Sequence, residues 1–236
     1  LEVVDSTNTY LRNMLQKKCA SVGDCVIANA QTGGRGRLGR SFLSRADMGI
    51  FMTLLYFTDE KLEDAVNVTT ATAAFVAESI EEVTGKRMLI KWVNDIYNED
   101  GKVSGILAES VITEKGTAII VGIGINTGDI DFPNELKGIA STVGELDGRE
   151  NILIAKITDR LMDFAGNSRD RSYMKDYRER FMLDGKPVDL YVGGLMTGAG
   201  QIAAGVAEDH GQHNGPADQG HKPPPVTAFS LLGRFV

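Results

Sequence analysis

The segment Gln31-Thr-Gly-Gly-Arg-Gly-Arg-Leu-Gly-Arg40 decides which nucleotide-binding folds this sequence can adopt. Its glycines match the spacing G-x-G-x-x-G of dinucleotide-binding proteins, but that fingerprint requires a helix that opens at the third glycine. Here the chain continues through Ser41-Phe42 toward a strand near Ile50. A G-x-x-x-x-G-K-[ST] run is absent from the sequence as well. The sequence therefore excludes a Rossmann domain and a P-loop.

The arginines of this segment predict a site for an anionic ligand. Arg35, Arg37 and Arg40 are closely spaced on a glycine-rich backbone that a ligand can approach, and guanidinium groups neutralise phosphate and carboxylate charges. A basic solvated loop and a nucleic-acid contact are the alternatives. The net charge of −7 and the lack of interleaved aromatic side chains argue against nucleic acid. A small anionic ligand is the favoured interpretation.

The segments around these arginines predict an α+β fold. Upstream, Ser6 is a favourable N-cap for a helix that ends near Lys17-Lys18. Apolar residues spaced by three and four from Leu62 to Val83 predict a long helix that packs on a core. Because strands and helices do not alternate regularly, we expect a mixed or antiparallel sheet backed by helices. We expect strands at Cys25–Ala30, Ile50–Phe57, Met88–Trp92, Lys102–Val111 and Thr117–Ile125, and two further helices at 154–164 and 174–181.

Three more segments carry polar residues or glycines beside predicted strands. They are Lys91-Trp-Val-Asn-Asp95, Gly101-Lys-Val-Ser-Gly-Ile-Leu-Ala-Glu109 and Val121-Gly-Ile-Gly-Ile-Asn126. Each has a purely structural interpretation: surface lysines, a tryptophan in the core, and a tightly packed strand. Glycines within a strand also let a ligand lie against it, so the third segment is open to a binding role in which Asn126 contacts a base or an amide.

Composition restricts the class of protein. The chain has 236 residues, of which 42% are hydrophobic and 24% charged, and this is enough apolar content for a folded core. Its longest nearly uncharged apolar run, 117–126, is too short to cross a bilayer, and no signal-peptide pattern opens the chain. Cys19 and Cys25 form neither a disulfide framework nor a four-ligand zinc site. We therefore expect two reduced thiols in a cytoplasmic protein.

Taken in order, these segments resemble the biotin protein ligase family. The resemblance covers residues 1 to about 207 and rests on five motifs: Asp5-Ser-Thr-Asn8 before a helix, the arginine segment 31–40, Lys-Trp-x-Asn-Asp, Gly-Lys-Val-Ser-Gly-Ile-Leu-x-Glu and Gly-Ile-Gly-Ile-Asn. It implies a catalytic α+β domain like that of class II aminoacyl-tRNA synthetases, followed by a small SH3-like β domain. It also implies the monofunctional type without an N-terminal DNA-binding domain.

We expect three regions along the chain. Residues 1–183 form the catalytic domain that binds biotin and ATP, and residues 184–207 begin the small β domain. Residues 208–236 depart from the family pattern, because they lose strand periodicity and contain all three histidines and four of the six prolines. We expect the β domain to be incomplete and 208–236 to be a disordered tail.

The resemblance implies a two-step ligase reaction. Biotin protein ligases convert biotin and ATP to biotinyl-5′-AMP and then transfer biotin to a lysine of a biotin carboxyl carrier protein domain, with Mg²⁺ accompanying ATP. Two alternatives stay open: transfer of lipoate or octanoate on the same fold, and a non-catalytic biotin-binding protein. We expect no nucleic-acid or membrane partner, and exposed strand edges leave a homodimer open.

The same resemblance assigns roles to residues. Arg37 and Lys102 are the catalytic cations, which offset the repulsion between the biotin carboxylate and the triphosphate. Asp95 is a candidate for a Mg²⁺ contact, but no metal ligand and no base for the transfer step is assigned. The expected biotin-binding residues are Ser6, Thr7, Asn8, Gln31, Arg35, Gly36, Arg37, Lys102 and Gly105. The expected ATP-binding residues are Arg35, Arg37, Phe42, Asn94 and Asn126.

Overall fold

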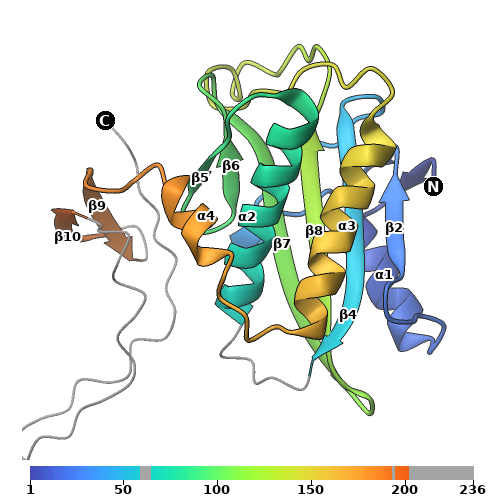
Figure 1. Cartoon of the computed structure of the whole chain (residues 1–236). Coiled ribbons are helices and arrows are strands. Elements are labelled where there is room, and N and C mark those ends of the chain that lie inside the picture. Colours follow the sequence, from blue (N-terminus) through green and yellow to red (C-terminus); the bar gives the residue numbers. More distant parts are fainter. Residues whose placement is uncertain (59–64, 193–194, 202–236) are drawn as a thin grey trace, which may run out of the picture. The chain divides into compact units, whose positions relative to one another are not determined.

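An antiparallel sheet of six strands carries the fold (Figure 1). The computed structural model describes residues 1–58, 65–192 and 195–201. Across the sheet the strand order is β2-β4-β8-β7-β6-β5, and each neighbouring pair is antiparallel. The predicted α+β class is confirmed. The strands are β2 (Cys25–Ala28), β4 (Gly49–Thr58), β8 (Gly116–Asn126), β7 (Lys102–Thr113), β6 (Asp95–Tyr97) and β5 (Leu89–Lys91).

Helices cover both faces of this sheet. In Figure 1, α2 (Ala65–Thr84) and α3 (Glu150–Gly166) lie across one face, and α1 (Thr7–Gln16) lies against the other. The α2 side chains at the predicted apolar spacing, such as Val76 and Ile80, are fully buried, because one stripe of the helix faces the sheet. A short helix, α4 (Met174–Glu179), follows α3.

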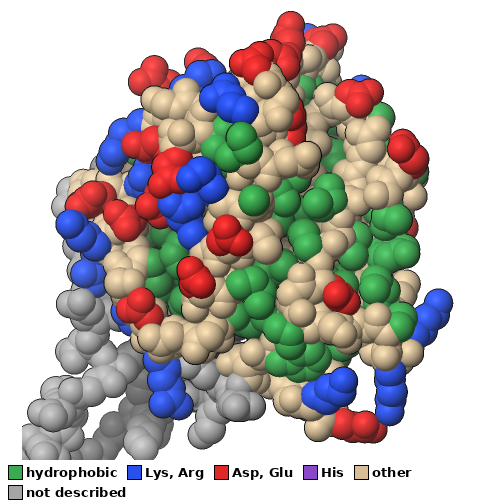
Figure 2. Space-filling model, turned by 45° about the vertical axis from the view of Figure 1, so that its right-hand side comes forward, with side chains coloured by type: hydrophobic (Ala, Val, Ile, Leu, Met, Phe, Trp, Pro, Cys, Tyr) green, Lys and Arg blue, Asp and Glu red, His purple; other side chains and the backbone are tan. Residues whose placement is uncertain are grey.

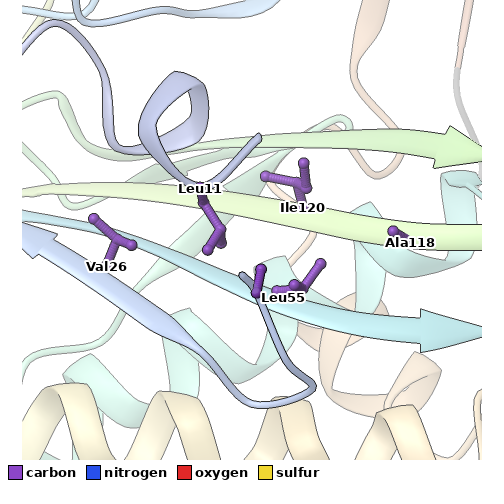
Figure 3. Packing of buried hydrophobic residues seen from close by; sticks show 6 residues of the cluster. Leu11, Val26, Leu55, Ala118 and Ile120 are labelled. Atoms are coloured by element: carbon purple, nitrogen blue, oxygen red, sulfur yellow. The ribbon is translucent and has the colours of Figure 1, made fainter. Parts of the chain in front are cut away.

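The face that carries α1 has its own hydrophobic cluster (Figure 3). Leu11 of α1 is fully buried and packs against Leu55 of β4 and Ile120 of β8. Val26 of the neighbouring strand β2 and Ala118 of β8 complete the contact. Burying a leucine in this way stabilises the fold by about 1.5–3 kcal/mol. The cluster therefore holds α1 against β4 and β8.

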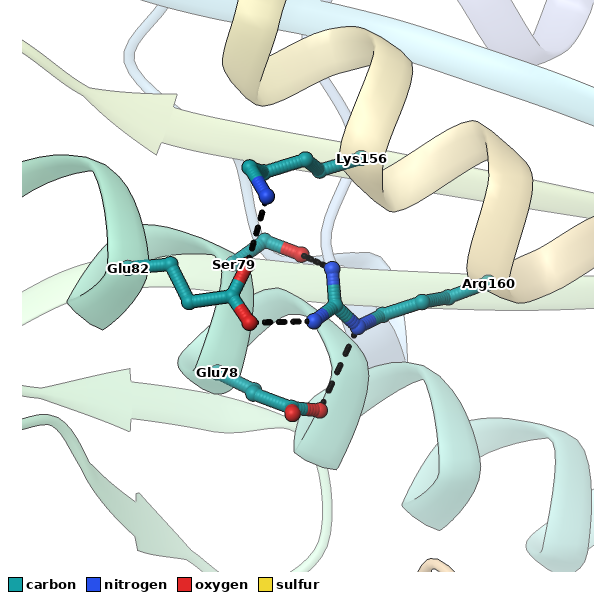
Figure 4. Close-up of polar contacts among 5 residues, drawn as sticks. All are labelled: Glu78, Ser79, Glu82, Lys156 and Arg160. Atoms are coloured by element: carbon teal, nitrogen blue, oxygen red, sulfur yellow. Dashed lines mark hydrogen bonds and ion pairs between the residues drawn. The ribbon is translucent and has the colours of Figure 1, made fainter.

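Polar contacts join the two helices on the opposite face (Figure 4). Arg160 of α3 donates to Glu78, Ser79 and Glu82 of α2 at 3.2, 3.2 and 2.7 Å. Lys156 Nζ lies 2.8 Å from the second carboxylate oxygen of Glu82 and lowers the pKa of that carboxyl by its hydrogen bond. These pairs lie at the surface, so they align the helices more than they stabilise them.

Several predicted elements differ in extent from the structure. Strand β6 was not predicted, because three residues are too short for a periodicity signal. The expected strand Cys25–Ala30 divides into β2 and β3 (Ala30–Gln31), and β3 pairs in parallel with β1 (Val3–Val4). Ser6 occupies the N-cap position of α1, as predicted, but its side chain makes no capping hydrogen bond. The predicted helix start at Leu62 lies outside the described residues.

The chain separates into two compact units, Leu1–Arg180 and Phe181–Val236. The described part of the second unit is an antiparallel hairpin of β9 (Pro187–Val192) and β10 (Leu195–Gln201). The predicted tail, 208–236, lies outside the described residues. Within the described ranges, no helix is long and apolar enough to span a membrane.

Strands β2 and β5 form the two edges of the main sheet. Ile27 on β2 is partly exposed, and Figure 2, which turns the right-hand side of Figure 1 forward, shows hydrophobic side chains interspersed with charged ones. Unpaired strand edges can extend a sheet into a second molecule. The homodimer stays a prediction.

Candidate functional site

One cross-strand row on the α1 face brings the predicted segments together. The register pairs Phe51 with Gly124, Gly124 with Gly105, Gly105 with Asp95, and Asp95 with Lys91. Because residues directly opposite each other in a sheet point to the same face, this row places one residue from each of five strands on that face. Its two central positions are glycines, so no side chain rises from the sheet there.

The side chain of Phe42 lies over these two glycines. A Cβ at Gly124 would stand 2.6 Å from the Phe42 ring, and one at Gly105 would stand 3.3 Å from it. The ring also meets Phe51 edge-on, with 6.3 Å between centroids. We call Gly105 and Gly124 the glycine floor. The Phe42 ring thus forms an apolar surface over the glycine floor. The structure brings together two residues, Phe42 and Gly105, that the resemblance assigned to different ligands.

The start of α1 forms a polar cluster at the next row, where Thr53 pairs with Gly122. Thr53 Oγ1 lies 2.7 Å from both Thr7 Oγ1 and Asn8 Oδ1. Gln31 Oε1 accepts from the backbone N–H of Thr7 at 2.9 Å and from its hydroxyl at 3.1 Å. Thr7 and Asn8 are buried, so this cluster presents fixed amide and hydroxyl groups beside the glycine floor.

Further contacts fix the two amide side chains of this cluster. Gln31 Nε2 donates to Ser44 Oγ at 2.8 Å, which sets the orientation of its amide. Asn8 Nδ2 donates to Glu109 Oε2 at 2.9 Å and lies 3.3 Å from Leu107 O. Ser6 is buried next to them, and its backbone N–H donates to Asp5 Oδ1 at 2.6 Å. The predicted residues Ser6, Thr7, Asn8 and Gln31 therefore lie together.

The arginine segment closes on itself next to the site. The Gly36 N–H donates to Arg40 O at 2.7 Å, across the short 3₁₀ helix Arg37–Gly39. Arg37 Nη1 donates to Asn94 Oδ1 at 3.2 Å, and Asn94 Nδ2 donates in turn to Ile106 O at 2.9 Å. The loop is therefore joined to the turn between β5 and β6 through a neutral amide.

The side chain of Lys102 lies beside Gly105. Its Nζ lies 2.8 Å from Asp95 Oδ1, an ion pair whose orientation falls outside hydrogen-bond geometry. A Cβ on Gly105 would stand 3.2 Å from the same nitrogen, so the glycine leaves room for the lysine side chain. Asn94 and Asp95 are adjacent in sequence. Two consecutive residues thus hold the two predicted catalytic cations, Arg37 and Lys102.

Further charges surround Asp95. Burial lowers the pKa of Lys91, with Lys102 and Arg40 acting in the same direction and Asp95 against them. Burial and the Asp95 carboxylate raise the pKa of Tyr97 to about 12, while Arg40 opposes this shift. Lys91 Nζ lies 5.6 Å from the centroid of the Tyr97 ring. This end of the site therefore holds three cations around one carboxylate, which favours an anionic ligand.

Asn126 differs from the expectation in what its side chain contacts. It lies at the end of β8 and is buried, and its Nδ2 donates to Ser141 O at 2.9 Å with Lys102 O at 3.5 Å. These acceptors are backbone carbonyls of its own chain. The amide therefore orders the segment around Ser141 behind Lys102, and its assignment to ATP stays a prediction.

The resemblance left several contributing residues unassigned. Thr53 places a hydroxyl group within the apolar strand 50–57, and this exception to the apolar pattern could have marked it as a site residue. Arg12 follows Asn8 by one helical turn, which places both on the same side of α1. Glu109 closes a quoted motif without a role. The positions of Ser44, Lys91 and Arg40 in the site depend on loop geometry and register, which the sequence does not display.

Asp95 is the site carboxylate that is paired with Lys102, and it is the candidate for a metal contact. Within the described ranges, no three His, Cys, Asp or Glu side chains group in a way that could hold a metal ion. Asp95 lies among the expected phosphate-binding groups, and Mg²⁺ is commonly held by one or two carboxylates together with substrate phosphates. The donor set fits a Mg²⁺ that arrives with a nucleotide.

Comparisons with known proteins identify relatives of this chain. The model of the biotin/lipoate A/B protein ligase family matches residues 1–126. The bifunctional ligase/repressor BirA of Bacillus subtilis is 34% identical over 172 residues, which are 72% of this chain and 53% of that protein. The biotin--[acetyl-CoA-carboxylase] ligase of Mycobacterium tuberculosis is 26% identical over 223 residues, covering 89% of this chain and 79% of that protein.

A solved structure extends the comparison to most of the chain. The biotin protein ligase from Aquifex aeolicus in complex with biotin and ATP superposes with a TM-score of 0.70 at 30% identity, covering 86% of this chain and 84% of that one. The chain spans about half the length of several curated relatives it matches, 53% of the B. subtilis BirA and 54% of the chloroplastic biotin--protein ligase 1 of Arabidopsis thaliana.

Proposed function

The chain belongs to the biotin/lipoate A/B protein ligase family, and from that premise we propose that it is a biotin protein ligase. It activates biotin with ATP to biotinyl-5′-AMP and transfers biotin to a lysine of a biotin carboxyl carrier protein domain. The observation that carries this proposal is the arrangement of Arg37 and Lys102, held by the consecutive residues Asn94 and Asp95 beside a floor of glycines.

The first step brings two anions together, and the cations of the site reduce the repulsion between them. The biotin carboxylate attacks the α-phosphorus of ATP, an acyl–phosphate bond forms, and pyrophosphate leaves with the electron pair of the broken P–O bond. Arg37 and Lys102 offset the charge of the carboxylate and the phosphate oxygens. No base is required, because a carboxylic acid is already ionised at pH 7. Asp95 is the protein carboxylate that would hold a Mg²⁺ bound with ATP, and that ion would neutralise part of the triphosphate charge.

Recognition of biotin is assigned to the polar cluster at the start of α1. The biotin head group is a cyclic urea, which offers one carbonyl acceptor and two N–H donors. Hydroxyl and amide groups of Ser6, Thr7, Asn8 and Gln31 match those requirements. Hydrogen bonds to Gln31 and Thr53 keep Thr7 and Asn8 in place before a ligand arrives. Gly36 and Arg35 belong to the segment that covers the ligand, and Gly105 leaves space beside it.

ATP is assigned to the side of Phe42 and Asn94. The aromatic ring offers a flat apolar surface for adenine, and Arg35 and Arg37 offer positive charge to the phosphates. Asn126 contributes by ordering the segment behind Lys102. In this proposal residues 1–183 form the catalytic domain, and the β domain that begins at 184 assists ATP and the carrier protein.

The second step transfers biotin to the carrier. The neutral amine of the acceptor lysine attacks the acyl carbon of biotinyl-5′-AMP, an amide bond forms, and AMP leaves with the electron pair of the acyl–phosphate bond. The amide nitrogen releases one proton to the solvent in this step. Closure of the arginine segment protects the adenylate from water until the carrier arrives.

The proposal is tested by biotin-dependent exchange of labelled pyrophosphate into ATP, with lipoate in a parallel reaction. Exchange with biotin alone supports the ligase. Exchange with lipoate alone assigns the chain to the lipoate branch of its family. Binding of biotin without exchange would identify a biotin-binding protein instead.

A further inference from the structure

The carboxylate of Glu109 receives donors from two separate parts of the site. Its Oε1 lies 2.7 Å from Arg12 Nη2 and 3.1 Å from Arg35 Nη2, and its Oε2 accepts from Asn8 Nδ2 at 2.9 Å. Arg12 and Asn8 belong to α1, and Arg35 belongs to the arginine segment. We call these four residues the Glu109 cluster. The Glu109 side chain is 16% exposed, so these contacts are only partly screened by water.

Glu109 reaches both parts because of its register. It lies on β7 opposite Ile120, two residues beyond Leu107, which pairs with Gly122. Its side chain therefore rises from the sheet next to Asn8, on the face that carries α1. A carboxylate has only acceptors, and its two oxygens can take all three donors at once. A glutamine at this position would have one acceptor oxygen and an amide nitrogen that repels donors.

Arg35 and Arg37 differ in how their charge is balanced. Arg35 faces the Glu109 carboxylate at 3.1 Å, whereas Arg37 bonds the neutral amide of Asn94. An arginine whose charge is already matched gains less from a phosphate than one held by a neutral partner.

We propose that Glu109 is a positioning residue of this site: it fixes the Asn8 amide toward the ligand and anchors the arginine segment through the Arg35 guanidinium. The Arg35 side chain then anchors the segment in addition to facing the ligand, and Arg37, which a neutral amide holds, supplies the larger share of the charge for the phosphates. This inference rests on the proposed ligase function for its kinetic consequences, and its structural consequence can be measured without that function.

The kinetic test compares Glu109→Gln with Glu114→Gln in biotin-dependent pyrophosphate exchange. Glu114 lies in the turn after β7 and makes an exposed ion pair with Lys18 at 3.3 Å, so its variant removes one carboxylate without touching the site. We expect Glu109→Gln to raise the KM for biotin about tenfold, as for loss of a hydrogen bond to a charged group. The effects on kcat and on the KM for ATP should be smaller, because Arg37 keeps its bond to Asn94. Glu109→Asp should recover part of the loss.

The structural test is limited trypsinolysis, read by mass spectrometry as cleavage after Arg35, Arg37 and Arg40. Glu109→Gln and Arg35→Ala should each expose the segment and speed cleavage after Arg37 and Arg40 several-fold relative to Glu114→Gln. The effects of the two substitutions on the cleavage rate should be less than additive, because either substitution alone already removes the Arg35–Glu109 pair.

The outcomes separate the inference from the proposed function. Equal cleavage rates in Glu109→Gln and Glu114→Gln, or fully additive effects of Arg35→Ala and Glu109→Gln, overturn the anchoring role whether or not the chain exchanges pyrophosphate. A biotin KM in Glu109→Gln equal to that of Glu114→Gln overturns the positioning of Asn8. Faster cleavage in a protein that shows no exchange supports the anchor and rejects only the ligase function.

Discussion

The side-chain oxygen Oδ1 of Asn8 lies 2.1 Å from the point that a Cβ on Gly122 would occupy. Gly122 sits in the middle of β8, where a glycine weakens a strand unless another group uses the space. Here that space holds the Asn8 amide, which is fixed in turn by Thr53 and Glu109. Because Gly122 has no side chain, the start of α1 can lie close to the sheet in the site.

Gly122→Ala should damage this arrangement. The new methyl group would push the Asn8 amide away, and overpacking of this kind costs about 1–3 kcal/mol of the free energy of unfolding. We expect weaker biotin binding by titration calorimetry and a lower thermal midpoint. Gly166→Ala is the matched control, because a Cβ there meets nothing within 4 Å. Unchanged biotin affinity in Gly122→Ala would contradict the role of Asn8.

Arg37→Ala should slow formation of the adenylate and let it escape. Removing one charged donor from the developing transition state costs about a hundredfold in rate, and the arginine segment also loses its bond to Asn94. The measurement is pyrophosphate exchange together with the fraction of labelled biotinyl-5′-AMP that stays with the protein on gel filtration. The exposed Arg45→Ala serves as the control. Normal exchange with full retention in Arg37→Ala would refute the assignment.

Lys102→Met should slow exchange strongly and weaken biotin binding to a smaller extent. Methionine keeps the apolar stem but removes the ammonium group that lies 2.8 Å from Asp95, so the carboxylate and phosphate lose a common cation. We expect a loss of about a hundredfold or more in kcat, measured beside Lys115→Met, which removes an exposed lysine from the turn between β7 and β8. Comparable kcat values in the two variants would place Lys102 outside the reaction.

Tyr97 should ionise late in the folded protein. Burial and the Asp95 carboxylate raise its pKa to about 12, above the ordinary value of 10.0. The neutral phenol is therefore favoured in the folded state, and its contribution to stability is complete below pH 10.0 and is lost as the pH rises toward about 12. Absorbance titration of phenolate should show the difference between the protein and Tyr97→Phe near pH 12. A difference centred near pH 10.0 would show that the ring is solvated.

Much of the scaffold followed from local patterns. The three- and four-residue spacing of apolar side chains predicts α2, and the long apolar runs predict β4 and β8, because helix and strand periods place hydrophobic residues on one face. Strand β6 escaped prediction, since three residues carry no period. It is also the strand that places Asp95 in the site.

The sequence by itself determined the fold class, the family and the residue types at the site, because turn glycines, clustered arginines and periodic apolar residues act locally along the chain. Only the tertiary structure decided which of these residues meet. Sheet register sets Gly124 beside Gly105, and the packing of α1 brings Asn8 to Glu109, 101 residues away. Pairing of distant strands depends on the burial of the whole core, and no short segment of the chain contains that information.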